Sequence, residues 1–184
     1  MTTRVRADAV RNAERVLEAA RAVFGERGMA AGIDEVAARA GVGKATVYRC
    51  WATKDELLAA VTGARVDWYS ALLEDALRER DAFQAFRTVL LTAAEGCCEN
   101  ALLYAGLTTV PESPELAAKR AVCRTLITEL VERAQAQGSM RPDVTAREIS
   151  VLFSGALSTL SREGERDVAV WRRCAELVVA ATRP

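Results

Sequence analysis

The 184-residue sequence contains no histidine. This absence excludes a Ser-His-Asp triad, an HExxH zinc site and a zinc finger with histidine ligands, because each needs an imidazole that titrates or binds metal near neutral pH. Cysteines occur at positions 50, 97, 98, 123 and 174, and no two of them form a CxxC pair. A thioredoxin-like motif and a zinc ribbon are therefore excluded as well. We predict that the protein is not an enzyme and carries neither a metal nor another cofactor.

Long apolar runs are also missing. No stretch reaches the ~18 unbroken apolar residues that a membrane helix needs. The N-terminal residues MTTRVRADAVRNAERV lack the apolar run and the cleavage site of a signal peptide. We therefore expect a cytoplasmic protein without a membrane partner. Its composition, with 51% apolar and 27% charged residues, is that of a globular domain rather than a disordered chain.

Charge is balanced over the whole chain but not along it. The sequence has 25 basic and 25 acidic residues. Residues 1–54 carry ten basic and six acidic side chains, so the remainder has an acidic excess of four. A basic N-terminal region on an acidic remainder indicates a polyanionic partner at one end of the molecule.

Apolar residues recur at helical spacing almost throughout. Val10 to Phe24 follow steps of three and four, which predicts a helix closed by Gly25 and Gly28. Two short helices are predicted over 33–40 and 44–49, and longer helices follow from Lys54 onward. No alternation typical of strands appears over a useful length. The sequence therefore predicts an all-α fold.

The break at Gly41 joins two short helices, which is the arrangement of a helix-turn-helix. Val42 and Val47 would fill its small core. The outer face would then carry the donors and hydroxyls that phosphates and base edges accept, on Lys44, Thr46, Tyr48 and Arg49. Spacing alone leaves a second interpretation open, because a helical hairpin with a solvated basic face has the same pattern.

Residues 16–61, VLEAARAVFGERGMAAGIDEVAARAGVGKATVYRCWATKDELLAAV, resemble the DNA-binding domain of the TetR (tetracycline repressor) family of bacterial regulators. The match runs in order through AARAVFGERG, IDEVAARAGVGKATVYR, Trp51 and KDELL, and it covers about a quarter of the chain. The resemblance implies a three-helix helix-turn-helix domain over residues 1–53 and a larger helical ligand-binding and dimerisation domain over residues 54–184. It also implies a homodimeric repressor that a small-molecule effector releases from a palindromic double-stranded DNA operator.

The same resemblance assigns roles to single residues. Lys44, Thr46 and Tyr48 fall on recognition-helix positions that meet DNA in this family, and Lys54 falls on a lysine that meets phosphate. A cation at a helix N-terminus opposes the macrodipole, which favours an outside anion at Lys54, although Lys54 could simply begin its helix. Tyr48 fits the core equally well. Gly43 either lets the backbone approach DNA or only starts the helix.

Two positions depart from the family pattern. Gly32 replaces the usual Ser or Thr cap of the second helix, at a cost of a few tenths of a kcal/mol. Cys50 replaces a His or Tyr and places a thiol beside the DNA. A thiol-based redox-sensing regulator acting through Cys50 or the body cysteines is therefore an alternative function, although inert packing of Cys50 is favoured. Adjacent Cys97 and Cys98 could bind a soft metal, but buried packing is again favoured.

The resemblance places a ligand chamber among the helices from about 54 to 138. A mostly apolar cavity with a few polar anchors could be lined by Trp68, Phe86, Tyr104 and Thr108, with Phe83 and Thr109 beside them, although each could equally be core. No motif identifies the ligand.

The last two helices are predicted to form the dimer surface, because their apolar faces are wide and Gly155 and its neighbours are small. Two helices from each subunit would make a four-helix bundle. The predicted contact residues are Phe153, Ala156, Leu157, Leu160, Trp171 and Val178. The alternative is that both helices pack only on their own subunit, and a purely structural helical protein remains a third functional class.

Overall fold

The computed structural model describes residues 2–100, 110 and 112–184. This part of the chain is helical and contains no strand, so the predicted all-α class is confirmed. The helices are α1 (Thr2–Arg27), α2 (Ile33–Ala40), α3 (Lys44–Cys50), α4 (Lys54–Ala76), α5 (Ala82–Glu99), α7 (Pro114–Ala136), α8 (Ala146–Glu163) and α9 (Val168–Ala181), with a 3-10 turn η1 (Gly28–Ala30) after α1. Within the described ranges, none of these helices has the length and apolar character required to cross a bilayer.

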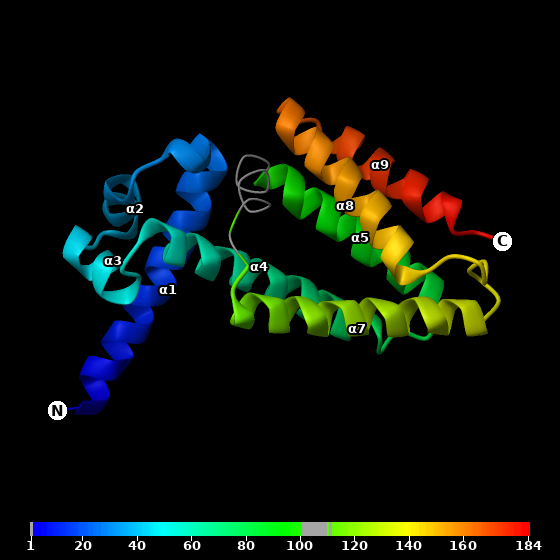
Figure 1. The fold of residues 1–184 in the computed structure, drawn as a ribbon, viewed down its shortest axis with the longest axis horizontal. Helices are drawn as coiled ribbons and strands as arrows, with labels where there is room; N and C mark the ends of the chain where they lie inside the picture. Colours follow the sequence, from blue (N-terminus) through cyan, green and yellow to red (C-terminus); the bar gives the residue numbers. More distant parts are fainter. Residues whose placement is uncertain (1, 101–109, 111) are drawn as a thin grey trace.

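The helices form two lobes joined by α4 (Figure 1). We call α1, α2, α3 and α4 up to Val61 the head, and the rest of the chain the body. Each lobe has its own apolar core. Since Leu57, Leu58 and Val61 of α4 belong to the head core, the division between the lobes falls inside α4 and not at residues 53 and 54.

α1 continues through Gly25 and ends at Arg27, immediately before Gly28. Gly25 is buried within the helix, where an added Cβ would lie 3.0 Å from Oδ1 of Asn100 at the end of α5. Gly28 has a φ of +69°, which only glycine adopts without strain and which ends the helix. Gly25 therefore serves the contact between α1 and α5.

The head core confirms the predicted packing of the helix-turn-helix. Val47 of α3 is buried, and Val42 in the turn packs against the same cluster. The most deeply buried partners come from α1, α2 and α4 and include Val16, Ala20, Phe24, Val36 and Leu57. A three-helix unit thus closes over the start of α4.

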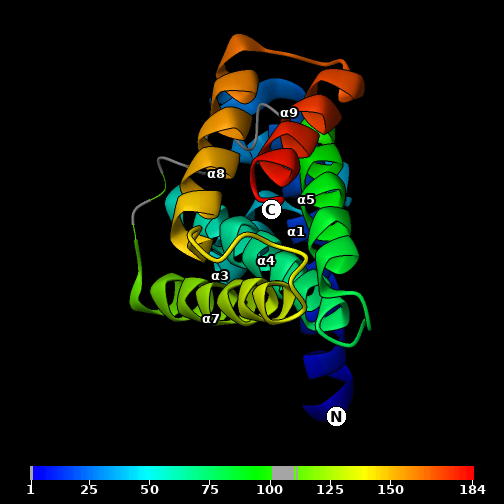
Figure 2. The same cartoon turned by 90° about the vertical axis from the view of Figure 1, so that its right-hand side faces the viewer.

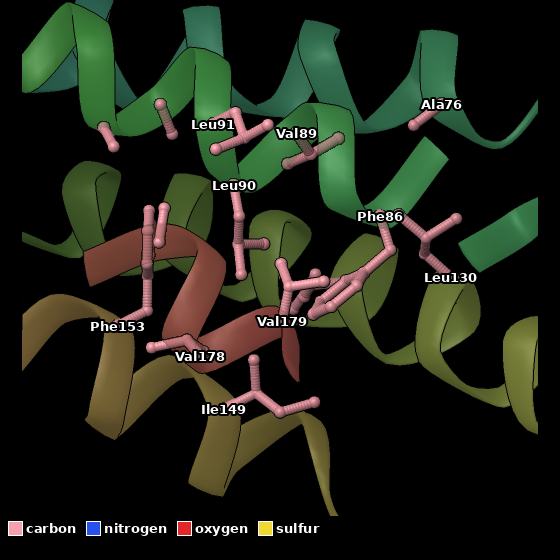
Figure 3. Packing of buried hydrophobic residues seen from close by; sticks show 14 of the residues in the cluster. Ala76, Phe86, Val89, Leu90, Leu91, Leu130, Ile149, Phe153, Val178 and Val179 are labelled. Carbon is pink, nitrogen blue, oxygen red and sulfur yellow. The ribbon is translucent and has the colours of Figure 1, made fainter. Parts of the chain in front are cut away.

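In the body, α4 packs along α7, and α5 packs along α9. Figure 2 shows α5, α8 and α9 side by side above α7. Their apolar side chains converge between the helices, as Figure 3 shows for Phe86, Leu90, Phe153 and Val179. This core holds the walls of the cavity described below in place.

Four of the six residues predicted for dimer contact lie in this core. Phe153, Leu157, Trp171 and Val178 are buried within their own chain, since α8 and α9 turn these side chains toward α5 and α7. Ala156 and Leu160 are half-buried. The outward faces of α8 and α9 instead carry Val151, Leu152, Val168 and Leu177. The prediction that these four buried side chains contact a second protomer is therefore wrong. The use of α8 and α9 for dimer contact stays a prediction.

Candidate functional site

The turn before α3 is fixed by backbone hydrogen bonds. Gly41 has a φ of +64° and ends α2, and its N–H donates to the carbonyl of Ala38 at 3.2 Å. The next N–H, of Val42, donates to the carbonyl of Ala37 at 3.1 Å. From α1, Nη2 of Arg15 donates to the carbonyl of Ala40 at 2.6 Å. The end of α2 is thereby tied to α1, which fixes where α3 begins.

α3 has one buried face and one exposed face. Val47 is buried, whereas Lys44, Arg49 and Tyr48 are exposed, with 43% of Tyr48 accessible. The alternative that Tyr48 belongs to the core is therefore wrong. Thr46 is half-buried, and its Oγ1 accepts a hydrogen bond from Nη2 of Arg49 at 3.2 Å. The four side chains predicted to meet DNA thus lie together on one short helix.

Gly43 precedes α3 as its N-cap in an extended conformation with a φ of −71°. A Cβ at this position would meet no atom within 4 Å. Neither backbone conformation nor packing within the described part of the chain therefore requires glycine here. An approach by an outside molecule remains a reason for glycine at this position.

Lys44 has an acidic partner within the head. Its Nζ lies 2.5 Å from Oδ1 of Asp34 in the first turn of α2, and both side chains are exposed. The hydrogen bond and the charge of Asp34 raise the pKa of Lys44. The ammonium is thus fully charged near neutral pH and already rests against a carboxylate.

Lys54 has partners inside the head that the sequence did not reveal. Its Nζ donates to the carbonyl of Ala31 at 2.8 Å and lies 5.6 Å from the centroid of the Phe24 ring. Both are favourable contacts for a cation. Lys54 therefore ties the start of α4 to the segment before α2. An outside anion is not needed to explain this residue, and its contact with phosphate stays a prediction.

The missing cap at Gly32 is offset by a neighbouring carboxylate. Oε1 of Glu35 accepts a hydrogen bond from the Gly32 N–H at 3.0 Å, and Glu35 is also paired with Arg27. The Gly32 N–H at the start of α2 thus has a hydrogen-bond acceptor on the third residue of the helix, Glu35.

A cavity of about 550 Å³ lies among α4, α5, α7 and α8. Its apolar wall is formed by Leu90, Ile127, Ile149, Phe153 and Leu157. Trp68 lines it as predicted and is 37% exposed. Phe86 is fully buried in the body core and is not part of the lining, and Phe83 is also buried there. Tyr104, Thr108 and Thr109 lie outside the described residues.

The polar side of the cavity includes residues that sequence reasoning missed. Arg65 of α4 and Arg120 and Arg124 of α7 line it, together with hydroxyls such as Ser150 and Ser154 of α8. Arg120 and Arg124 are four residues apart, which places them on one face of a helix. This spacing was the feature of the sequence that could have indicated a basic wall. Their meeting with Arg65, more than 50 residues earlier in the chain, depends on the packing of α4 along α7.

Arg65 is also part of a second, smaller cavity. This space of about 330 Å³ is lined by Leu17, Glu18 and Arg21 of α1 on one side and by Arg65 and Trp68 of α4 on another. Trp68 and Arg65 thus border both the larger cavity in the body and the space beside the head.

Three of the four body cysteines do not have the character of reactive thiols. Burial raises the pKa of Cys97, Cys98 and Cys123. Thiol reactivity requires the thiolate, which a raised pKa disfavours. Cys50 is exposed. No group of three or more potential metal ligands occurs within the described ranges, so the adjacent cysteines do not form such a site.

Two family models match consecutive parts of the chain. Residues 16–61 match bacterial regulatory proteins of the tetR family. Residues 63–184 match the C-terminal domain of SbtR-like transcriptional regulators. No curated protein matches the chain.

Solved structures of regulators have the same fold. The chain is 28% identical to a TetR transcription regulatory protein from Mycobacterium vanbaalenii, with a TM-score of 0.71 and coverage of 98% of this chain and 99% of that chain. It is 26% identical to a TetR transcriptional regulator from Streptomyces coelicolor, with a TM-score of 0.69 and coverage of 94% and 98%. The regulator FadR from Bacillus subtilis, solved in complex with stearoyl-CoA, is 16% identical, with a TM-score of 0.67 and coverage of 92% and 99%.

Proposed function

Because the chain belongs to the TetR family of bacterial regulatory proteins, we propose that it is a homodimeric repressor that leaves a palindromic operator when a small molecule binds in its body. The observation that carries this proposal is the outer face of α3. Val47 anchors the helix in the head, and Lys44, Tyr48 and Arg49 project from it. A regulator of bacterial transcription acts on DNA in the cytoplasm, which is where we place this protein.

The exposed face of α3 has the size and chemistry of a major-groove reader. The groove is about 12 Å wide and admits one α-helix. Lys44 and Arg49 supply charged donors for phosphates and for guanine, while Thr46 and Tyr48 supply hydroxyls. Gly43 leaves room at the start of the helix. A helix of seven residues reads few base pairs, so specific binding favours two heads on two half-sites.

The second head would come from a dimer formed through α8 and α9. Their outward faces expose Val151, Leu152 and Leu177, which are large apolar side chains. Gly155 lies in the same region of α8, and a Cβ there would meet nothing within 4 Å. Close approach by a partner helix is thus sterically open. Two helices from each protomer then build a four-helix bundle around a two-fold axis.

The body cavity would hold the effector. Its volume of about 550 Å³ lies within the range of ~300–1,000 Å³ typical of small-molecule pockets. Apolar walls with a few polar side chains are also typical of such pockets. FadR from Bacillus subtilis, which shares the fold, was solved with stearoyl-CoA.

Selection of bound duplexes from a random DNA pool tests this proposal. We expect enrichment of a palindrome whose half-site centres are about 34–36 Å apart, one helical turn, or a multiple of that distance. Arg49→Ala should lose the enrichment, whereas Arg78→Ala, at an exposed arginine after α4, should retain it. Recovery of unrelated or asymmetric sequences by the unaltered protein would contradict the proposal.

A further inference from the structure

We propose that the cavity among α4, α5, α7 and α8 binds an amphipathic organic anion, with its charged group at Arg65 and Arg124 and its apolar part against α5, α7 and α8. This inference rests on the proposed function, because it names the chemical class of the effector. The ligand class comprises carboxylates, sulfonates and phosphates that carry an alkyl or aromatic body.

The first argument is the charge of the lining. Three arginines and no Asp or Glu occur among the described residues that line the cavity. Arg120 is paired with Glu112 at the start of α7. Arg65 and Arg124, by contrast, have no carboxylate within ion-pair distance among the residues placed by the structure. Two of the three arginines thus bring positive charge to this cavity without a carboxylate in direct contact among the described residues.

The second argument is the surroundings of Arg65. Its side chain is half-buried, and its Nη2 donates to Sγ of Cys97 at 3.2 Å and to the carbonyl of Ala93 at 3.4 Å. Neither acceptor carries a charge, because burial raises the pKa of Cys97 and keeps the thiol protonated. A half-buried cation with only neutral acceptors is costly, and an anion from outside would relieve that cost.

The third argument is the way the guanidinium is held. Its carbon lies 4.1 Å from the centroid of the Trp68 ring, which is a stacked cation–π arrangement. A Cβ at Gly96 of α5 would lie 3.1 Å from Nη1 of Arg65 and 3.5 Å from Cη2 of Trp68, so glycine leaves space for the stacked pair. A planar guanidinium fixed in this way presents a fork of donors to a carboxylate or phosphate.

The apolar side chains that line the cavity favour a ligand with an apolar part. Ile127, Ile149, Phe153 and Leu157 offer an apolar wall on α7 and α8, and Leu90 of α5 continues it. An alkyl chain or aromatic ring would be stabilised there in proportion to the apolar area that it buries. A cationic amphiphile would find the same wall but would be repelled by the arginines.

Matched amphiphiles test the inference by isothermal titration calorimetry. The probes are dodecanoate, 1-dodecanol and dodecyltrimethylammonium, used below their aggregation concentrations, and the aromatic anion 8-anilinonaphthalene-1-sulfonate. We expect at least one of the two anions to bind about 10-fold or more tightly than 1-dodecanol, because hydrogen bonds between charged groups strengthen binding by about that factor. Dodecyltrimethylammonium should bind more weakly than 1-dodecanol.

Variants then locate the charged contact. Arg65→Met and Arg124→Met should each reduce anion affinity by about 10-fold and leave 1-dodecanol affinity within about threefold. Arg65→Lys should lose less than Arg65→Met, since it retains the charge. Arg78→Met removes an exposed arginine outside the cavity and should change neither affinity. Far-UV circular dichroism verifies folding, and Arg124 is exposed enough to be replaced without disturbing the core.

The inference would be overturned if 1-dodecanol bound as tightly as the anions or more tightly, or if neither anion bound. It would also be overturned if the ratio of anion affinity to alcohol affinity stayed unchanged in both the Arg65→Met and the Arg124→Met variant. These results are separate from the proposed function. A protein that selects a palindrome but prefers the alcohol or the cation would keep the function and lose the inference. A protein that binds the anions but selects no DNA would lose the function and keep the inference.

Discussion

Lys44 rests on Asp34 before any DNA is present. A phosphate that approaches Lys44 must therefore compete with this carboxylate or accept its presence nearby. Exposed ion pairs of this kind are weak because water screens them, so the pair can open. Asp34 is thus expected to moderate DNA affinity while its charge favours the N-terminus of α2.

Replacing Asp34 with Asn should increase affinity for any duplex by about two- to fivefold at low salt, since it frees Lys44 and removes a charge that repels phosphate. Fluorescence anisotropy over a series of salt concentrations measures the effect. Asp55→Asn is the matched control, because Asp55 is also exposed in the first turn of a helix. An increase of the same size in both variants would assign the effect to net charge and not to the Lys44–Asp34 pair.

The role of a residue could be predicted from sequence where its neighbours in space are also its neighbours along the chain. The exposure of Lys44 and Arg49 and the burial of Val47 follow from one short helix and its turn, whereas the sequence left the exposure of Tyr48 open. Lys54 and Phe86 could not be placed in this way. The carbonyl that accepts from Lys54 belongs to Ala31, 23 residues earlier, and Phe86 is buried by helices that follow it in the chain.

α8 has apolar residues on both sides, which is why its inward face could not be identified from sequence. Leu157 is 2% exposed and packs in the body core, whereas Leu152 is 58% exposed. Helical periodicity predicts that such a helix exists, but neighbouring helices decide which side they cover. The same limit explains the corrected dimer residues on α9, where Trp171 is buried and Leu177 is exposed.

The two leucines of α8 give a paired prediction. Leu152→Glu should dissociate the proposed dimer and leave a folded protomer, since the new charge points away from the core. Leu157→Glu should unfold the protein, because an unpaired buried charge costs several kcal/mol. Sedimentation velocity measures the first effect and circular dichroism the second. A dimer of unchanged stability in Leu152→Glu would place the interface elsewhere.

At the scale of the whole molecule, α4 belongs to both lobes. Leu57 and Val61 pack in the head, and Leu73 and Ala76 pack in the body. Between them, Arg65 and Trp68 border both the body cavity and the space beside α1. A ligand that moves these two side chains would therefore act on groups that also border the head.

The sequence predicted the two-lobed helical plan but not this connection. The helices before and after Lys54 follow from the spacing of apolar residues and from glycine breaks, although α1, with 26 residues, is not a short helix. The boundary inside α4 could not be found, because the helix continues without a break from one core to the other. The three cavity arginines come from α4 and α7, so only their packing brings the positive charge together.

The most direct test of ligand-controlled DNA binding is to titrate dodecanoate into the free protein and into its complex with the selected palindrome. Linkage requires that each ligand weakens the other by the same factor, and couplings of ~1–3 kcal/mol correspond to about 5- to 150-fold. We predict weaker dodecanoate binding to the complex, an equal loss of DNA affinity when dodecanoate saturates the protein, and much less DNA release in Arg65→Met at the same dodecanoate concentration. Dodecanoate binding of equal affinity to the free protein and to the complex would contradict the account.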